Sequence, residues 1–388
     1  MTYINPTLIN EVRGLRLTSE EKQYILSKMH PPAPDGYRYA DAVFEGAGIK
    51  GIALLGAMRC CDDLGLRWQK LAGSSSGSLT AALLAANFAI DRLEQELGEL
   101  DYMQFLSQKT SPLIFCGDPR DDMKFPFWML FFLLVTRSLG QYSSEPLHSW
   151  VASTLKSRKI KTFRDLEKGS RQLKVVASDI SRREMLLLPD DLNPAAPNLE
   201  NQQRTVRENI LRSYCLESYL DFTVAEAVRL SLSIPLFFEP GRLGDYMILD
   251  GGLLSNFPLW IYDVQPQSGQ PARLPRWPTF GFRLLDNSTG RQSQIKGVFD
   301  IFSASLRTMA EARDRYHLRE IDRGRTIEID VTDAGVTTTQ FNVKPAEKAE
   351  LYRLGYDYTK KFFLSEWNWS EHLIQRGFSP PIPQGGPA

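Results

Sequence analysis

Apolar residues occur along the chain in runs of two lengths that alternate and are separated by turn residues. Residues 39–44 and 66–72 are short apolar runs typical of buried strands. Residues 50–64 and 78–88 are longer apolar stretches typical of helices. Strands that alternate with helices at this spacing indicate a parallel sheet covered on both faces. The expected fold class is therefore α/β.

The same patterns continue to the end of the chain. Thr18 and Glu21 form a capping box that opens a helix to about Met29, and a second capping box opens a helix at Thr223. A long helix is expected near 296–316 and another at 345–363. The stretch 190–205, rich in Pro, Asn and Gln, is expected to be a surface loop. The further expected strands are 173–178, 184–188, 246–249, 279–284 and 326–331.

The segment from about 90 to 165 is mostly helical and interrupts the alternation, which predicts one domain with a helical insertion. The segment contains the most apolar run, Phe125–Val135, which falls short of the roughly 20 residues that span a bilayer. This run fits either a buried helix or a lid that contacts lipid. We divide the chain into an N-terminal helical segment with a Pro-rich linker (1–37), the main domain (38–364) and a partly disordered tail (365–388).

Composition and charge exclude several classes of protein. Apolar residues make up 43% of the chain, and 46 basic residues balance 46 acidic ones. Without a broad basic field, nucleic acid is not an expected partner. The four cysteines give neither a disulfide framework nor a zinc pattern, and Cys60 and Cys61 fit small buried thiols. The N-terminus shows no signal peptide, so we expect a cytoplasmic protein.

The strongest chemical signal is the sequence Gly73-Ser74-Ser75-Ser76-Gly77, between an expected strand and an expected helix. G-x-S-x-G at such a junction is typical of a nucleophile elbow. The turn is so tight that the residues two before and two after the nucleophile must be small. Ser75 has Gly73 and Gly77 at these two positions, and it would lie at a helix N-terminus, where backbone amides favour an alkoxide.

A second glycine-rich turn, Gly46-Ala47-Gly48-Ile49-Lys50-Gly51, follows the first strand. It also matches the dinucleotide fingerprint, which requires an acidic residue at the end of the next strand. That strand runs into the elbow instead, and the nearest acids, Asp62 and Asp63, lie in the helix. The turn fits better as an oxyanion hole beside Ser75, because adjacent strand–turn–helix units place their turns on one edge of the sheet.

A third feature, Asp250-Gly251-Gly252, follows the expected strand at 246–249. If that strand is parallel to the others, its end lies on the same edge as the elbow, and Asp250 can reach Ser75. Gly251 and Gly252 allow a sharp turn that leaves the carboxylate approachable.

A Ser-Asp-His triad would add a histidine as the base. The order Ser…Asp…His admits His317 or His372. His317 lies in a highly charged helix and His372 lies near the tail, and neither follows an expected strand. We therefore favour a Ser–Asp dyad. The alternatives are a triad esterase of the α/β-hydrolase type and a non-catalytic nucleotide or anion module that uses Gly46–Gly51. The four histidines of the chain are His30, His148, His317 and His372.

These motifs, in this order, resemble those of the patatin-like phospholipase family. The resemblance covers about residues 40–260, with weaker similarity to about 363. Three further segments of the sequence support it, namely Val176-Ala177-Ser178-Asp179, Ser233-Ile234-Pro235-Leu236-Phe237-Phe238-Glu239-Pro240 and the continuation Leu253-Leu254-Ser255-Asn256-Phe257-Pro258 after the third motif.

The resemblance implies a three-layer sandwich with a mostly parallel central sheet, a patatin-like variant of the α/β-hydrolase or Rossmann-like architecture. It further implies Ser75 as nucleophile, Asp250 as base and an oxyanion hole at the amides of Gly46, Ala47 and Gly48. Many members have three consecutive glycines in this turn, whereas Ala47 occupies the middle here. If that position needed a positive φ, the Ala47 Cβ would cost on the order of 1 kcal/mol.

Two more features of the turn depend on the same resemblance. Lys50 matches the basic position of the family, although a solvated lysine at a helix start is about as plausible an interpretation, and Gly51 completes the motif. The implied activity is hydrolysis of phospholipid or lysophospholipid acyl esters without calcium, metal or cofactor, with transient contact to a membrane surface. The oligomeric state does not follow from the sequence.

Overall fold

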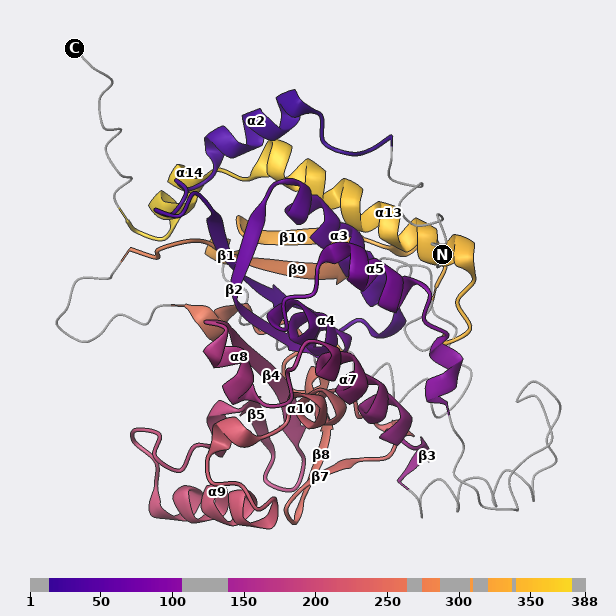
Figure 1. The fold of residues 1–388 in the computed structure, drawn as a ribbon, viewed down its shortest axis with the longest axis vertical. Coiled ribbons are helices and arrows are strands. Elements are labelled where there is room, and N and C mark those ends of the chain that lie inside the picture. Colours follow the sequence, from indigo (N-terminus) through magenta and orange to yellow (C-terminus); the bar gives the residue numbers. More distant parts are fainter. Residues whose placement is uncertain are drawn as a thin grey trace.

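The computed structural model describes residues 14–106, 139–263, 274–286, 308–309, 320–336 and 340–378. Two successive strand–turn–helix units open the fold (Figure 1). β1 (Arg38–Phe44) leads through the 3-10 helix η1 (Gly48–Gly51) into α3 (Ile52–Asp63). β2 (Leu66–Ser74) leads into α4 (Ser76–Ala85). The expected alternation of strand and helix is confirmed here.

The other elements of the described ranges follow in chain order. The strands are β3 (Gly140–Tyr142), β4 (Gln172–Asp179), β5 (Glu184–Leu188), β6 (Leu236–Phe238), β7 (Gly241–Leu243), β8 (Tyr246–Asp250), β9 (Thr279–Leu285) and β10 (Thr326–Asp330). The α-helices are α2 (Ser19–Lys28), α5 (Ile90–Gly98), α7 (Glu145–Ser157), α8 (Phe163–Lys168), α9 (Asn201–Ser213), α10 (Val224–Ser231), α12 (Glu320–Arg323), α13 (Pro345–Lys361) and α14 (Trp369–Gln375). The short helical turns are η2 (Tyr102–Phe105), η3 (Asp190–Leu192), η4 (Tyr219–Asp221), η5 (Gly251–Leu253), η6 (Leu259–Tyr262), η8 (Thr332–Ala334) and the π-turn η9 (Phe362–Glu366).

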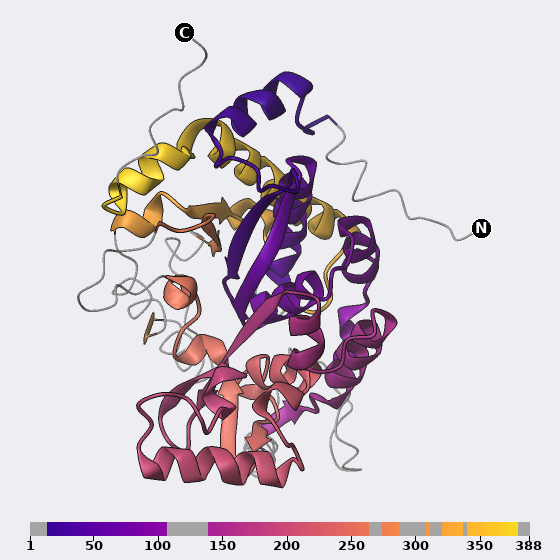
Figure 2. The same cartoon turned by 60° about the vertical axis from the view of Figure 1, so that its left-hand side comes forward.

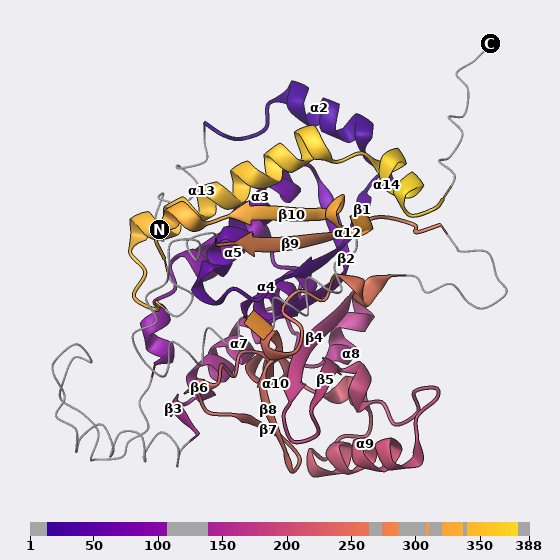
Figure 3. The ribbon, with the colours of Figure 1, turned by 180° about the vertical axis from the view of Figure 1, so that it is seen from behind.

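In the described ranges, the central sheet has eight strands and is mostly parallel. Its order is β10-β9-β1-β2-β4-β8-β7, and β5 pairs with β4. The pairs from β10 to β4 are parallel, whereas β5, β8 and β7 join by antiparallel pairing. Figure 3 shows β9 and β10 side by side next to β1. β3 and β6 form a separate parallel pair.

The two faces of the sheet bury alternate residues of each strand, as the period of a strand requires. Phe44 on β1 belongs to the large core that includes α3 and α13. Val43 and Ala72 belong to a smaller cluster, where they pack with Phe257 and Leu259. The segment that follows the third motif therefore covers one face of β1 and β2.

Helices α3 and α13 pack unusually closely, and two glycines make this contact feasible. A Cβ on Gly56 would lie 1.9 Å from the Tyr352 carbonyl oxygen, and one on Gly355 would lie 1.8 Å from the Ala53 carbonyl oxygen. α3 itself is buried from Ile52 to Cys61, and the one charged residue of this stretch, Arg59, is paired with Glu94. Cys60 and Cys61 are buried thiols, as expected, and burial raises the pKa of both.

Helix α2 begins as predicted. The Thr18 hydroxyl accepts from the Glu21 amide at 3.1 Å, and the Glu21 carboxylate accepts from the Thr18 amide at 2.8 Å. This reciprocal pair confirms the capping box. In all three views α2 and α9 lie at opposite ends of the molecule (Figure 2).

The expected loop at 190–205 is wrong, because it contains the turn η3 and the start of α9. The side chains of Glu200 and Gln203 form a capping box at the start of α9. The apolar residues that anchor α9, Ile210 and Leu211, come late in the helix, beyond the polar stretch on which the expectation was based. α14 lies within the expected tail, and its residue Trp369 is buried.

Several expectations concern residues outside the described ranges. These are the apolar run Phe125–Val135, most of the helix near 296–316 and the end of the expected tail, residues 379–388. Within 90–165, the described residues form α5, η2, α7 and the start of α8, together with the unexpected strand β3. None of the described helices is both long and apolar enough to cross a bilayer.

Candidate active site

Ser75 lies in the turn between β2 and α4, in a strained backbone conformation. Its φ is +49° and its ψ is −129°, a region that L-residues rarely occupy. A Cβ on Gly73 would lie 2.3 Å from the Gly77 carbonyl carbon, and one on Gly77 would lie 2.4 Å from the Phe44 carbonyl oxygen. Both glycines are therefore required by close backbone contacts, and the turn has the geometry of a nucleophile elbow.

One edge of β4 is shared by two strands that approach from opposite directions. β2 pairs in parallel with the first part of β4 and ends with Ser74 opposite Val176. β8 pairs antiparallel with the last part of β4 and ends with Asp250 opposite Ala177. Because β5 pairs with these same β4 residues, it occupies the other edge. The ends of β2 and β8 therefore meet on one edge of β4.

This meeting brings Ser75 and Asp250 into direct contact. The Ser75 hydroxyl donates to the Asp250 carboxylate, with 2.6 Å between Oγ and Oδ2. The other carboxylate oxygen, Oδ1, accepts from the Gly252 amide at 2.7 Å. The expected reason for this proximity, a parallel strand ending at the shared edge, is wrong, because β8 runs antiparallel to β4.

Both side chains are almost fully enclosed, with 6% of each residue exposed. Burial raises the pKa of Asp250 to about 6, although its hydrogen bonds with Ser75 and Gly252 favour the charged form. A carboxylate with this pKa is ionised at neutral pH and is a stronger base than an exposed aspartate. The Asp250 carboxylate can therefore accept the proton of the Ser75 hydroxyl.

The backbone of Ser75 is held by Ser231 at the end of α10. The Ser75 amide donates to Ser231 Oγ at 2.9 Å, and the Ser231 hydroxyl donates to the Val176 carbonyl at 2.6 Å. Ser231 is fully buried and thus ties the elbow to β4. Sequence reasoning missed this residue, and its one signal is the position of a serine at the end of the helix that Thr223 opens.

The glycine-rich turn packs directly over the elbow, but two of its amides already have partners. The Gly46 amide donates to the Asn256 carbonyl at 3.2 Å. The Ala47 amide donates to Ser76 Oγ at 3.0 Å. Gly48 is the first residue of η1, where amides have no acceptor within the helix.

The substitution of alanine for glycine at position 47 introduces no backbone strain. Ala47 has φ −142°, which any residue adopts, whereas Gly48 has φ +55°. The left-handed conformation therefore falls on a glycine that the sequence retains, and the anticipated cost at Ala47 does not arise.

Asn256 connects the glycine-rich turn to the loop after Asp250. Its side-chain amide donates to the Gly46 carbonyl at 2.8 Å and to Glu45 Oε1 at 3.4 Å. Glu45 Oε2 in turn accepts from the Leu284 amide at 2.7 Å. In the sequence Asn256 is one residue of the segment that continues the third motif, and its position six residues after Asp250 gives no indication of this contact.

Lys50 is buried, with 4% of the residue exposed, and forms an ion pair with Asp286, just after β9. The interpretation of Lys50 as a solvated lysine at a helix start is therefore wrong. Sequence reasoning missed Asp286, because a single aspartate after a strand has no distinctive pattern. A Cβ on Gly51 would lie 3.3 Å from Ser76 Oγ, so this end of the turn also packs on the elbow.

In the described ranges, no histidine hydrogen-bonds to Ser75 or Asp250. His372 is buried and stacks on Trp369, and its ring nitrogens have no hydrogen-bond partner in the part of the chain that the structure describes. Burial and the nearby Arg376 lower the pKa of His372 to about 3. His317, the other candidate for a triad, lies outside the described residues. His30 is buried against the same tryptophan, and His148 lies near two glutamates of α7 and α10.

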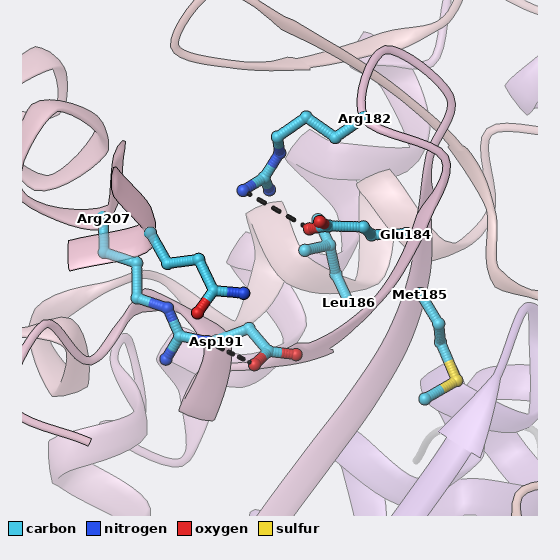
Figure 4. Close-up of a pocket in the computed structure, with 7 residues that line it drawn as sticks. Arg182, Glu184, Met185, Leu186, Asp191 and Arg207 are labelled. Carbon is cyan, nitrogen blue, oxygen red and sulfur yellow. Dashed lines mark hydrogen bonds and ion pairs between the residues drawn. The ribbon is translucent and has the colours of Figure 1, made fainter. Parts of the chain in front are cut away.

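A cavity of about 300 Å³ lies away from this site, beside β5 and α9 (Figure 4). Because β5 occupies the edge of β4 opposite to β2 and β8, the cavity is on the far side of β4 from Asp250. Its two arginines, Arg182 and Arg207, are paired with Glu184 and Asp191. The cavity is therefore balanced in charge and does not contribute to the serine site.

Comparison with known proteins identifies the family. The family model described as patatin-like phospholipase matches residues 42–262. The uncharacterized protein YqhO of Bacillus subtilis (strain 168) is 32% identical over 336 residues, which cover 85% of this chain and all of YqhO. The probable lipid hydrolase 463L of Invertebrate iridescent virus 6 is 24% identical over 230 residues, which cover 58% of this chain and 63% of the viral protein.

Two solved structures are more distantly similar. VipD from Legionella pneumophila is 17% identical with a TM-score of 0.46, over 87% of this chain and 70% of VipD. A chain of the complex of ExoU with SpcU from Pseudomonas aeruginosa is 17% identical with a TM-score of 0.41, over 90% of this chain and 53% of that chain. Because the family model matches more than half of the residues of this chain, the chain belongs to the patatin-like phospholipase family.

Proposed function

We propose that this protein is a lipid acyl hydrolase of the phospholipase A type, with Ser75 as nucleophile and Asp250 as base. The observation that carries the proposal is the 2.6 Å hydrogen bond between these two side chains at a strained elbow. The family match and the similarity to a probable lipid hydrolase support a phospholipid or lysophospholipid as substrate.

In the first half of the reaction, Asp250 accepts the hydroxyl proton as Ser75 Oγ bonds to the ester carbonyl carbon. The negative charge moves to the carbonyl oxygen. When the tetrahedral intermediate collapses, the bond to the leaving alcohol breaks and Asp250 returns the proton to that alcohol. The fatty acyl group remains on Ser75.

In the second half, water replaces the alcohol. Asp250 accepts a proton from the water molecule as its oxygen attacks the acyl carbon. The bond to Ser75 Oγ then breaks, and the proton returns to the serine. The products are a free fatty acid and the regenerated enzyme, so the cycle needs no histidine.

Stabilisation of the oxyanion is expected from the glycine-rich turn and from the N-terminus of α4. The amide of Gly48 is the best placed of the three expected donors, because it begins η1. The amides of Gly46 and Ala47 would have to exchange their present partners before they could contribute. The positive end of the α4 dipole adds a smaller favourable contribution at Ser75.

The proposed reaction requires no calcium, because Asp250 supplies the base and backbone amides stabilise the negative charge of the oxyanion. It also requires the protein to meet its substrate at a lipid surface, so we propose a transient, peripheral contact with membranes. Both statements extend the family resemblance to this chain.

A fluorophosphonate probe tests the nucleophile directly. The Ser75 hydroxyl is expected to attack the phosphorus and release fluoride, which leaves a stable adduct on Ser75 that peptide mass spectrometry locates. Ser75→Ala should lose all labelling, whereas Ser74→Ala, the same change one residue earlier, should keep it. A wild-type protein that is folded and unlabelled would favour a non-catalytic module instead.

A further inference from the structure

We propose that the Ser76 hydroxyl is an additional oxyanion donor of this site and hence a further catalytic residue; this inference rests on the proposed function. In this scheme the Ala47 amide does not bind the oxyanion itself. It donates to Ser76 Oγ, and the Ser76 hydroxyl donates onward to the carbonyl oxygen that becomes negative.

The hydrogen bonding of the four neighbouring serines singles out Ser76. The Ser75 hydroxyl is bonded to Asp250, and the Ser78 hydroxyl donates to the Ser75 carbonyl at 2.6 Å. Ser74 Oγ has no hydrogen-bond partner among the described residues, but Ser74 is completely buried. Ser76 alone among the four is partly exposed. Its hydroxyl can therefore meet a substrate without a rearrangement of the core.

The hydrogen of the Ser76 hydroxyl is available. A hydroxyl has one proton to donate and two lone pairs to accept with. The Ala47 amide occupies a lone pair, with 3.0 Å between N and Oγ. In the part of the chain that the structure describes, no oxygen accepts the proton. A hydroxyl that already accepts a hydrogen bond is polarised into a better donor.

The position of Ser76 also fits a donor to the oxyanion. It directly follows the nucleophile and begins α4. The glycine-rich turn packs on both residues, since a Cβ on Gly46 would lie 2.8 Å from Ser75 Cβ and one on Gly51 would lie 3.3 Å from Ser76 Oγ. The hydroxyl thus lies against the segment from which the oxyanion hole is expected.

The inference also accounts for how the turn's amides are used. The Gly46 amide is bonded to the Asn256 carbonyl and the Ala47 amide to Ser76. If the oxyanion hole consisted only of the amides of Gly46, Ala47 and Gly48, then Gly48 would be the one donor that need not exchange a partner. With Ser76 included, a second donor is present while both internal hydrogen bonds stay intact.

The test compares Ser76→Ala, Ser76→Thr and Ser74→Ala in hydrolysis of p-nitrophenyl butyrate, a soluble ester. Removal of one oxyanion donor should lower kcat roughly 10²–10³-fold and leave KM nearly unchanged. Ser76→Thr keeps the hydroxyl and should retain kcat within about tenfold, and Ser74→Ala should retain it within about twofold. An arylboronic acid, which forms a tetrahedral adduct with serine, should bind Ser76→Ala more weakly by a factor similar to the loss in kcat/KM.

A wild-type or raised kcat in Ser76→Ala would overturn the inference, and a raised value would mean that Ser76 blocks the Ala47 amide. If Ser76→Ala does not fold, Ser76→Cys replaces the hydroxyl by a weak thiol donor, and unchanged kcat in that variant would overturn it equally. Hydrolysis that is absent from wild type, or that survives in Ser75→Ala, would overturn the proposed function together with this inference. If kcat is unchanged in Ser76→Ala while hydrolysis still depends on Ser75, this inference is overturned but the proposed function is not.

Discussion

Ser75 and Asp250 are 175 residues apart in the sequence, yet their side chains are joined by a 2.6 Å hydrogen bond. The contact arises because β2 and β8 approach each other along one edge of β4 and end opposite its consecutive residues Val176 and Ala177. Gly251, directly after the end of β8, has no room for a side chain: a Cβ there would lie 2.3 Å from the Val176 carbonyl oxygen. The geometry of the pair is thus built into the sheet.

Replacement of the proposed base should remove activity without loss of the fold. We expect Asp250→Asn to lower kcat by roughly 10²–10⁴-fold, because an amide cannot accept the serine proton. The measurement is ester hydrolysis with far-ultraviolet circular dichroism as a check on folding. Asp245→Asn, the same change at an exposed site in the turn before β8, is the matched control. Near-normal kcat in Asp250→Asn would show that another group is the base.

The pH profile should report the same carboxylate. Burial raises the pKa of Asp250 to about 6, and only the ionised form can accept a proton. We therefore expect kcat/KM to fall about tenfold per pH unit below pH ~6 and to level off above it. A profile with no inflection between pH ~5 and ~7 would contradict this assignment.

The raised pKa of Asp250 also affects stability, which should fall with rising pH whereas kcat/KM should rise. A buried carboxyl with a pKa above its ordinary value of 3.8 stabilises the fold while it is protonated, and this stability is lost as the pH rises through about 6. The rise in the pKa of Asp250 from 3.8 to about 6 corresponds to roughly 3 kcal/mol of stability. Asp250→Asn does not titrate, so its free energy of unfolding relative to wild type should increase between pH ~4 and ~7.

Chemical denaturation of both proteins at several pH values measures this difference. Asp41, whose pKa burial also raises to about 6, is present in both proteins and cancels in the comparison. A difference that is independent of pH would mean that Asp250 is not desolvated as the structure indicates.

Loss of the Ser231 hydroxyl should affect both stability and rate. Ser231→Ala removes the side-chain hydrogen bonds to two buried backbone groups, the Ser75 amide and the Val176 carbonyl, and should cost roughly 1–3 kcal/mol. Because Ser75 is then less firmly held at its positive φ, kcat should fall as well. Ser233 follows the end of α10, and Ser233→Ala removes only a hydrogen bond to the Arg229 carbonyl of that helix, so this variant should be nearly neutral. Equal behaviour of the two variants would refute the positioning role of Ser231.

Much of the site could be predicted from the sequence because its signals are local. The G-x-S-x-G turn identified Ser75 through steric demands that glycine alone meets, and the two glycine-rich turns lie at junctions of strand and helix. The order of the first strands follows from the same alternation. The start of α2 was equally readable, since Thr18 and Glu21 satisfy each other within one turn.

The remainder depends on contacts between distant segments. The direction of β8 is set by its pairing with β4, which no feature of residues 246–250 reveals. The partners of Lys50 and Gly46, namely Asp286 and Asn256, lie more than 200 residues away and have no characteristic spacing. Ala47 and Ser76 are only 29 residues apart, but their spacing also has no characteristic pattern, so the sequence could not indicate this hydrogen bond.

The most direct test of the central claim is release of free fatty acid from mixed phospholipid vesicles by wild type and Ser75→Ala, each with and without a calcium chelator. We expect release by wild type that resists the chelator and is absent from Ser75→Ala, with both proteins equally folded by thermal unfolding. Release that persists in Ser75→Ala would contradict Ser75 as the nucleophile. No release from a folded wild-type protein that also fails to react with a fluorophosphonate would contradict the assignment of lipid acyl hydrolysis itself.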